Sequence, residues 1–151
     1  MVTLHEGKQY IVNNDHIATA EEAAKLSAEE GKKQTLTYQV LEKHNHSDNM
    51  EHLEVKFDSM GVYDNTYVGI LQTAYASGLK EFPMPCVFTN CHNCLCAVGG
   101  TINTDVHKYA ESACKKSGGI FVPPHEAVIH QYMREMIVKS GDMSIVSDSH
   151  T

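Results

Sequence analysis

The sequence predicts an α/β domain: a parallel-type β-α-β-α-β-α-β sheet with helices on both faces, preceded by a polar, mostly helical N-terminal segment. From residue 53 onward, short apolar stretches alternate with longer segments in which apolar residues recur every three or four positions. Connections that contain a helix join parallel strands as crossover units. Residues 1–52 are more polar, so we expect them to form a segment separate from residues 53–151.

We expect helices in the polar segment, residues 1–52. Thr19 and Glu22 fit a capping box that would start a helix over residues 20–30, and Gly31 would end it. The stretch TLTYQVLEKHN, residues 35–45, is the next predicted helix.

Four strands are predicted in residues 53–151. The first, LEVKFD at residues 53–58, alternates apolar and charged side chains, as a strand with one buried face does. The others are the short apolar stretches PCVFT, GIFV and MSIV, at residues 85–89, 119–122 and 143–146.

The three helices predicted between these strands have recognisable start and stop signals. In the first, Asp64 or Asn65 can cap the start and Gly78 can supply a left-handed end. In the second, Thr104 can cap the start and Gly118 can end the helix.

The third predicted helix covers residues 125–138. Pro124 can sit in its first turn, and Ser140 and Gly141 follow its end. Its apolar stripe is expected to be buried and consists of Ile129, Met133, Met136 and Ile137.

Polar residues follow the last three predicted strands. In open α/β sheets, ligands bind beyond the carboxyl ends of the strands. The segments that follow the strands are TNCHNCLC, PPHE and SDSHT. We therefore expect residues 90–96, 123–125 and 148–151 to meet at one end of the sheet and to form a site.

Four of the five cysteines lie in CVFTNCHNCLC, residues 86–96. Cys86, Cys91 and Cys94 have the C-x4-C-x2-C spacing of plant-type ferredoxins, and Cys96 or Cys114 could supply a fourth thiolate. A small iron-sulfur or zinc-binding protein that uses Cys86, Cys91, Cys94 and Cys96 is therefore an alternative function. Against it, the interval VFTN is bulky and favours a strand, so we expect Cys86 and Cys114 to be small buried side chains.

The charge balance limits the partners of the chain. It has 19 acidic and 12 basic residues, a formal net charge of −7, and one arginine, Arg134. Such a composition argues against binding to nucleic acid or to an anionic membrane. Because the sequence lacks a basic leader and a long apolar run, we expect a soluble cytoplasmic protein.

Four motifs in order along the chain resemble those of one enzyme family. They are an Asp-x-Thr segment with its helix in YDNTYVGILQTAYASGL, a histidine step in TNCHN, an Ile-His-Gln helix in VIHQ, and the tetrapeptide Asp-Ser-His-Thr in SDSHT. Over roughly residues 35–151, the chain resembles the aconitase and isopropylmalate dehydratase family of iron-sulfur hydro-lyases, and in particular the bacterial aconitase-like hydratases. The resemblance implies the N-terminal portion of an enzyme that reversibly dehydrates a hydroxy-carboxylic acid.

The resemblance also implies roles for individual residues. The catalytic set would be His92, His130, Asp148 and His150, and the substrate contacts would be Ser149, Asp64 and Thr66. Within the catalytic set, His130 and Asp148 would form an imidazole and carboxylate pair, and His92 would be a second acid. Two positions depart from the family pattern: Cys91 stands where the family has Asp, and Val68 where it has Gln.

The family holds its [4Fe-4S] cluster through cysteines of a later domain. The resemblance therefore implies that the ligands are not in this chain and that no metal is bound here. The partners would be a small hydroxy-acid substrate and the remaining hydratase domains or a partner subunit. The chain would stop inside the active-site loop and would be inactive by itself.

Overall fold

A computed structural model describes residues 10–12, 16–25, 27–64, 66–89 and 101–148. The chain divides into two compact units, Met1–Lys56 and Phe57–Thr151. Within the described residues, no helix combines the length and the apolar character that are needed to cross a membrane.

The first unit contains a β-hairpin and three helices. Strands β1 (Tyr10–Val12) and β2 (His16–Ala18) pair in antiparallel fashion, and α1 (Ala20–Ala23), α2 (Ala28–Lys33) and α3 (Leu36–His44) follow them. The helix predicted at residues 35–45 is confirmed, with Thr35 as its N-cap. The hairpin was not predicted.

The single helix predicted over residues 20–30 is wrong, because two short helices take its place. The Thr19 and Glu22 capping box forms as expected, with the Thr19 N–H donating to Glu22 Oε2 at 2.9 Å. A second box follows, in which Ser27 and Glu30 bond each other and start α2. Gly31 therefore lies inside a helix and does not end one.

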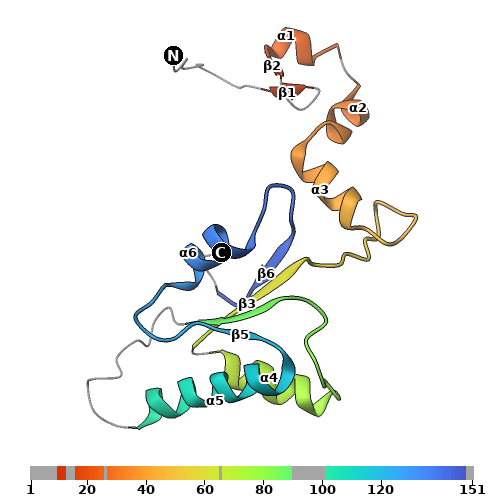
Figure 1. Cartoon of the computed structure of the whole chain (residues 1–151). Coiled ribbons are helices and arrows are strands. Elements are labelled where there is room, and N and C mark those ends of the chain that lie inside the picture. The colour runs from red at the N-terminus through yellow and green to blue at the C-terminus, as the bar shows by residue number, and fades with distance from the viewer. Residues whose placement is uncertain (1–9, 13–15, 26, 65, 90–100, 149–151) are drawn as a thin grey trace. The chain divides into compact units, whose positions relative to one another are not determined.

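The second unit is built on a four-stranded sheet in the order β5-β4-β3-β6, in which every pair is parallel (Figure 1). Its strands are β3 (Ser59–Tyr63), β4 (Cys86–Thr89), β5 (Ile120–Phe121) and β6 (Ser144–Val146). The register pairs Met60 with Cys86 on one side of β3 and with Ile145 on the other. The predicted parallel α/β fold is confirmed.

The first strand lies later than predicted. β3 occupies Ser59–Tyr63, and the LEVKFD segment contributes only an isolated bridge between Val55 and Asn45. A parallel strand with helices on both faces needs apolar or small residues on both sides. The alternating charges of LEVKFD could not be buried there, whereas SMGVY carries none.

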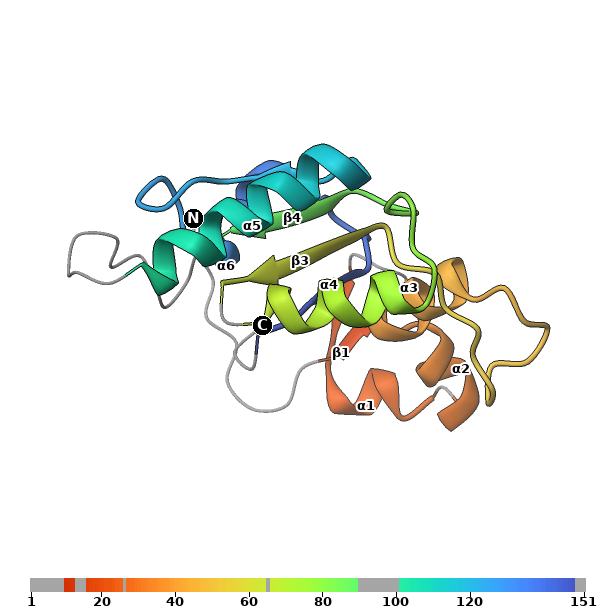
Figure 2. The ribbon, with the colours of Figure 1, turned by 90° about the horizontal axis from the view of Figure 1, so that it is seen from below.

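Two helices cover one face of the sheet, and a shorter helical stretch covers the other (Figures 1 and 2). We call the first the α4/α5 face, after α4 (Tyr67–Ala76) and α5 (Ile102–Ser117). The second is the α6/η1 face, after α6 (Ile129–Tyr132) and the π-helix η1 (Met133–Ile137). Neighbouring residues of β4 point to opposite faces: Cys86 and Phe88 pack under α4 and α5, and Val87 packs under α6.

The starts of α4 and α5 differ from the prediction, and their ends agree with it. The N-caps are Thr66 and Thr101, neither with a side-chain cap hydrogen bond, in place of the expected Asp64 or Asn65 and Thr104. Gly118 ends α5 in the left-handed conformation with φ of 84°, as expected.

The third predicted helix is shorter and less regular than expected. It starts at Ile129, and the residues predicted as its first turn form a turn instead, in which His125 has a positive φ of 71°. The Val138 N–H donates to Met133 O at 2.8 Å, a bond between residues five apart that defines η1. This wider turn explains why Met136, expected to be buried, is 67% exposed, whereas Ile129 and Met133 are buried as predicted.

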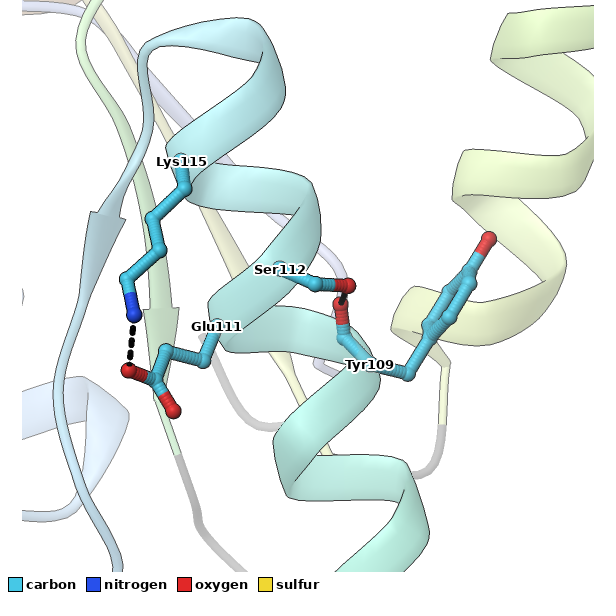
Figure 3. A network of polar contacts seen from close by, with 4 residues as sticks. All are labelled: Tyr109, Glu111, Ser112 and Lys115. Carbon is cyan, nitrogen blue, oxygen red and sulfur yellow. Dashed lines mark hydrogen bonds and ion pairs between the residues drawn. The ribbon is translucent and has the colours of Figure 1, made fainter.

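The outer side of α5 carries only weak polar contacts (Figure 3). Lys115 Nζ lies 2.6 Å from Glu111 Oε1, and the Ser112 hydroxyl donates to Tyr109 O at 2.7 Å. Exposed ion pairs of this kind contribute little. We infer that α5 is held mainly by its buried side, where Ala110 and Ala113 join the core.

The strand order reverses direction between β3 and β6. The chain moves from β3 to β4 and β5, and then returns past both to place β6 on the other side of β3. In α/β folds, ligands bind beyond the carboxyl ends of the strands at such a reversal. A ligand site is therefore expected at the segments that follow β3 and β6.

Candidate active site

The segments after β3 and β6 meet at the carboxyl end of the sheet. The ladder continues one residue past β6, because the Ser147 N–H donates to Gly61 O at 3.0 Å. Asp64 follows β3 directly and Asp148 comes two residues after β6, and both carboxyl groups are buried. Two acidic side chains thus emerge next to the strand-order reversal.

Three residues form a closed ring of hydrogen bonds between these segments. The Tyr63 N–H donates to Ser147 Oγ at 3.2 Å, and the Thr66 hydroxyl donates to Tyr63 O at 3.1 Å. Thr66 Oγ1 and Ser147 Oγ are 2.7 Å apart. Either hydroxyl can donate in the contact between Thr66 and Ser147, and when the Thr66 proton goes to Tyr63 O, Ser147 is the donor.

His130 and Asp148 come together at the same end of the sheet. Nε2 of His130 is 3.6 Å from Oδ2 of Asp148. The carboxylate is 1% exposed and the imidazole 37% exposed, so one partner is enclosed and the other reaches solvent. The distance is long for a direct hydrogen bond but suits an ion pair when the imidazole is protonated.

The position of His130 depends on how closely α6 approaches the sheet. A Cβ atom at Gly61 would lie 3.1 Å from Met133 Sδ and 3.2 Å from Ile129 Cδ1. A larger residue at Gly61 would therefore require the Met133 and Ile129 side chains to move by a few tenths of an ångström. The Thr89 hydroxyl, at the end of β4, also donates to Ala127 O at 3.0 Å and ties the segment before α6 to the sheet.

A hollow of about 370 Å³ lies beside His130 on the α6/η1 face. Most of its lining is apolar, with His130, Arg134 and Ser144 as the polar exceptions. Its residues are Ile129, His130, Met133, Arg134, Val138, Ser144 and Val146. The imidazole is therefore next to a space that a small organic molecule could enter.

Four of the seven site residues predicted from sequence can be placed. Asp64 and Thr66 follow β3, and His130 and Asp148 form the pair described above. The other three, His92, Ser149 and His150, lie outside the described residues, and their roles stay predictions. The Thr66 hydroxyl already makes two hydrogen bonds within the protein, to Tyr63 O and to Ser147 Oγ.

Two residues of the site were missed from the sequence. Ser147 was treated as part of a loop, although its place directly after a strand and before Asp148 is a usable signal. Gly61 was overlooked because the first strand was placed too early. A glycine inside an apolar strand often marks a close backbone approach.

The described cysteines do not suit metal binding. Cys86 and Cys114 are buried in the core under α4 and α5, as expected. Burial raises the pKa of both thiols to about 12, and nearby Cys114 adds to the effect at Cys86. Both side chains pack among apolar residues of this core, as small buried thiols do.

The other potential metal ligands among the described residues are also not grouped into a site. Over the part of the chain that the structure describes, no group of three or more His, Cys, Asp or Glu side chains could hold a metal ion. Cys91, Cys94 and Cys96 lie outside the described residues. A four-cysteine site would need Cys86 or Cys114, and both of these residues are in the core.

Comparison with known proteins identifies relatives. Residues 38–151 match the model of the aconitase family (aconitate hydratase). A stretch of 44 residues is 48% identical to 3-isopropylmalate dehydratase large subunit 2 of Archaeoglobus fulgidus. That stretch covers 29% of this chain but 11% of the relative, so the chain spans only a small part of the length of the curated protein that it matches.

Proposed function

The chain belongs to the aconitase family, and from this we propose that it supplies one wall of the active site of a hydro-lyase for a small hydroxy-carboxylic acid. The observation that supports the proposal most is the pair of His130 and Asp148, 3.6 Å apart at the carboxyl end of the sheet. Reversible dehydration needs a proton removed from carbon and a hydroxyl group protonated as it leaves. Histidine is suited to such transfers near neutral pH.

In the proposed mechanism, Asp148 acts on His130. The enclosed carboxylate lies nearest Nε2, where it favours a proton on that nitrogen and fixes the orientation of the ring. The imidazole, being partly exposed next to the hollow, is the member that can reach a substrate. His92, His150 and Ser149 are proposed to complete this side of the active site. Asp64, which follows β3, is proposed as a substrate contact.

Members of the family normally carry a [4Fe-4S] cluster. The two described thiols do not fit such a group, because both are core side chains with raised pKa values. We propose that the ligands of the cluster are outside this chain, and we assign the chain only binding, orientation and proton transfer.

We further propose that polypeptide outside residues 1–151 completes the active site. The curated relative is named a large subunit, and the matched stretch is 11% of it. The remaining hydratase domains or a partner subunit would supply the metal centre and the groups that bind the substrate carboxylates. The chain alone is then expected to be inactive.

An assay with and without complementing polypeptides tests the proposal. The purified chain is treated anaerobically with iron and sulfide and offered citrate, isocitrate, isopropylmalate, homocitrate and methylcitrate, and the absorbance of the unsaturated product is followed. We expect no turnover by the chain alone, and turnover after addition of the proteins encoded next to it. His130→Gln should lower that turnover by about 10²- to 10⁴-fold, the usual contribution of a positioned acid or base.

Gly69→Ala is the matched control for this assay, because Gly69 lies on α4 with nothing near its Cβ position, and it should leave turnover unchanged. Turnover by the chain alone after replacement of all five cysteines would contradict the proposal. So would full activity of His130→Gln in the complemented enzyme.

A further inference from the structure

We propose that Ser147 and Thr66 are positioning residues: their hydroxyl groups form a latch that holds Asp148 against His130. The latch is the hydrogen-bonded ring of Tyr63, Thr66 and Ser147. It joins the segment after β3 to the segment after β6, which are 81 residues apart at Thr66 and Ser147.

Ser147 is anchored through both its backbone and its side chain. Its N–H donates to Gly61 O, its Oγ accepts from the Tyr63 N–H, and its hydroxyl shares a hydrogen bond of 2.7 Å with the Thr66 hydroxyl. Each of these groups bonds to β3 or to the turn that starts α4. The residue that directly precedes Asp148 therefore has little freedom to move.

The opposite directions of two neighbouring side chains explain how the latch acts on Asp148. Ser147 and Asp148 form a bend directly after β6, and their side chains contact opposite sides of the sheet. Val146 packs on the α6/η1 face, Ser147 points to the start of α4, and Asp148 points back to His130 on α6. Fixing Ser147 toward α4 consequently fixes Asp148 toward α6.

A second pair of hydroxyl groups joins the same two strands at their other end. Ser59 Oγ and Ser144 Oγ are 2.6 Å apart, and Ser59 is buried. This contact resembles the latch in chemistry but lies at the opposite ends of the two strands, and its Ser144 also lines the hollow. Removing the Ser59 hydroxyl, with Ser144 kept in place, provides a control for the loss of an interstrand hydrogen bond as such.

The catalytic importance of the latch rests on the proposed function, since proton transfer requires groups held within about half an ångström of their working positions. The latch itself is tested without substrate. Its failure would leave the proposed function standing, and a failed activity assay would leave the latch standing.

The test is NMR spectroscopy of the purified chain. The imidazole signals of His130, assigned by their loss in His130→Gln, report its surroundings, and hydrogen exchange of the Tyr63 N–H reports the ring. Ser147→Ala and Thr66→Val should each shift the His130 signals. Each should also speed exchange of the Tyr63 N–H by about tenfold relative to the parent, after correction for global stability.

The double variant should differ little from either single variant in both readouts. Each substitution already breaks the same ring of hydrogen bonds, so the second has nothing further to remove. Ser147→Thr and Thr66→Ser keep a hydroxyl and should restore the His130 signals toward those of the parent. Ser59→Ala should lower stability but leave the His130 signals in place.

The latch is wrong if the His130 signals do not move in Ser147→Ala, or if Ser59→Ala moves them equally. If Ser147→Ala does not fold, Thr66→Val decides by the same two readouts, because Thr66 is partly exposed and its isosteric replacement keeps the shape of the turn.

Discussion

The two faces of the sheet differ in regularity and in chemistry. The α4/α5 face is covered by two regular helices and carries an aromatic core of Tyr67, Phe82 and Phe88. The α6/η1 face is covered by one helical turn and a π-helix, and it has a small core beside a hollow. The regular face stabilises the fold, and the irregular face carries the candidate site.

The difference is consistent with what each face has to do. Long helices with buried apolar stripes supply most of the packing energy. A π-helical turn disturbs that packing but re-aims side chains, and such turns are frequent at functional sites. Substitutions on the two faces should therefore affect different properties of the chain.

Phe88→Ala is expected to have the largest effect and to act through stability. Phe88 is fully buried, and its ring centroid lies 5.8 Å from that of Tyr67 and 5.5 Å from that of Phe82. The free energy of unfolding should fall by about 3–5 kcal/mol, measured by urea denaturation. A loss below about 1 kcal/mol would show that this face does not carry the stability of the fold.

The thiols of the α4/α5 face should be nearly unreactive in the folded chain. The pKa of Cys86 and of Cys114 is raised from 9.0 to about 12, which reduces the thiolate fraction at pH 8 roughly a thousandfold. Alkylation at pH 8, followed by mass spectrometry, should label both residues only after unfolding. Rapid labelling in the folded chain would mean that this face is open.

The same thiols give a pH dependence whose sign is fixed. In the unfolded chain the thiols lose their protons near pH 9, and in the folded chain only near about 12. Between these values the folded state binds more protons, so its stability is complete below about pH 9 and falls as the pH rises toward 12. Replacing Cys86 and Cys114 with Ala should remove this part of the alkaline loss.

Gly61→Ala should have an intermediate effect and should act on both stability and the site. The new methyl group would lie 3.1–3.2 Å from the side chains of Met133 and Ile129, which must shift to make room for it and so disturb the packing around α6 and η1. Unfolding should become easier by about 1–3 kcal/mol, and the His130 signals should shift. Gly69→Ala is the matched control. Its new methyl group would meet no atom within 4 Å on the exposed side of α4, and the substitution should stabilise the fold by about 0.5–1 kcal/mol.

The smallest effect is expected at Lys115. The side chains of its ion pair with Glu111 are 73% and 46% exposed, so solvent screens the interaction. Lys115→Ala should change the free energy of unfolding by at most about 0.5 kcal/mol, with no change at His130. A larger loss would mean that the outer side of α5 contributes to the fold.

The sequence predicts the regular face better than the irregular one. The second strand and the stop signal at Gly118 follow from local patterns that the packing of α4 and α5 preserves. The turn before Ile129 and the π-helix after Tyr132 could not be predicted, because a periodicity of 3.6 residues carries no sign of a wider turn. The first strand was wrongly predicted at LEVKFD for a related reason. Alternating apolar and charged residues indicate a strand with one buried face, whereas a strand inside this sheet is covered on both faces.

The candidate site shows the same limit. His130 and Asp148 were proposed as a pair through the family resemblance, because nothing local links a helix residue to a loop 18 positions later. Ser147 and Gly61 act through distances between segments far apart in the chain. Such distances depend on the tertiary fold.

The most direct test of the division between the faces is to map the binding of a hydroxy acid by NMR. The labelled chain, combined with the polypeptides proposed to complete the site, is titrated with citrate, isopropylmalate and their counterparts that lack the hydroxyl group. We predict saturable shifts at His130 and along the α6/η1 face for at least one hydroxy acid, weaker shifts for its counterpart, and none along α5. Asp148→Asn, which keeps the shape of the side chain but removes its charge, should weaken the response at His130. Saturable shifts confined to the α4/α5 face, or no response at His130 to any hydroxy acid, would contradict the account.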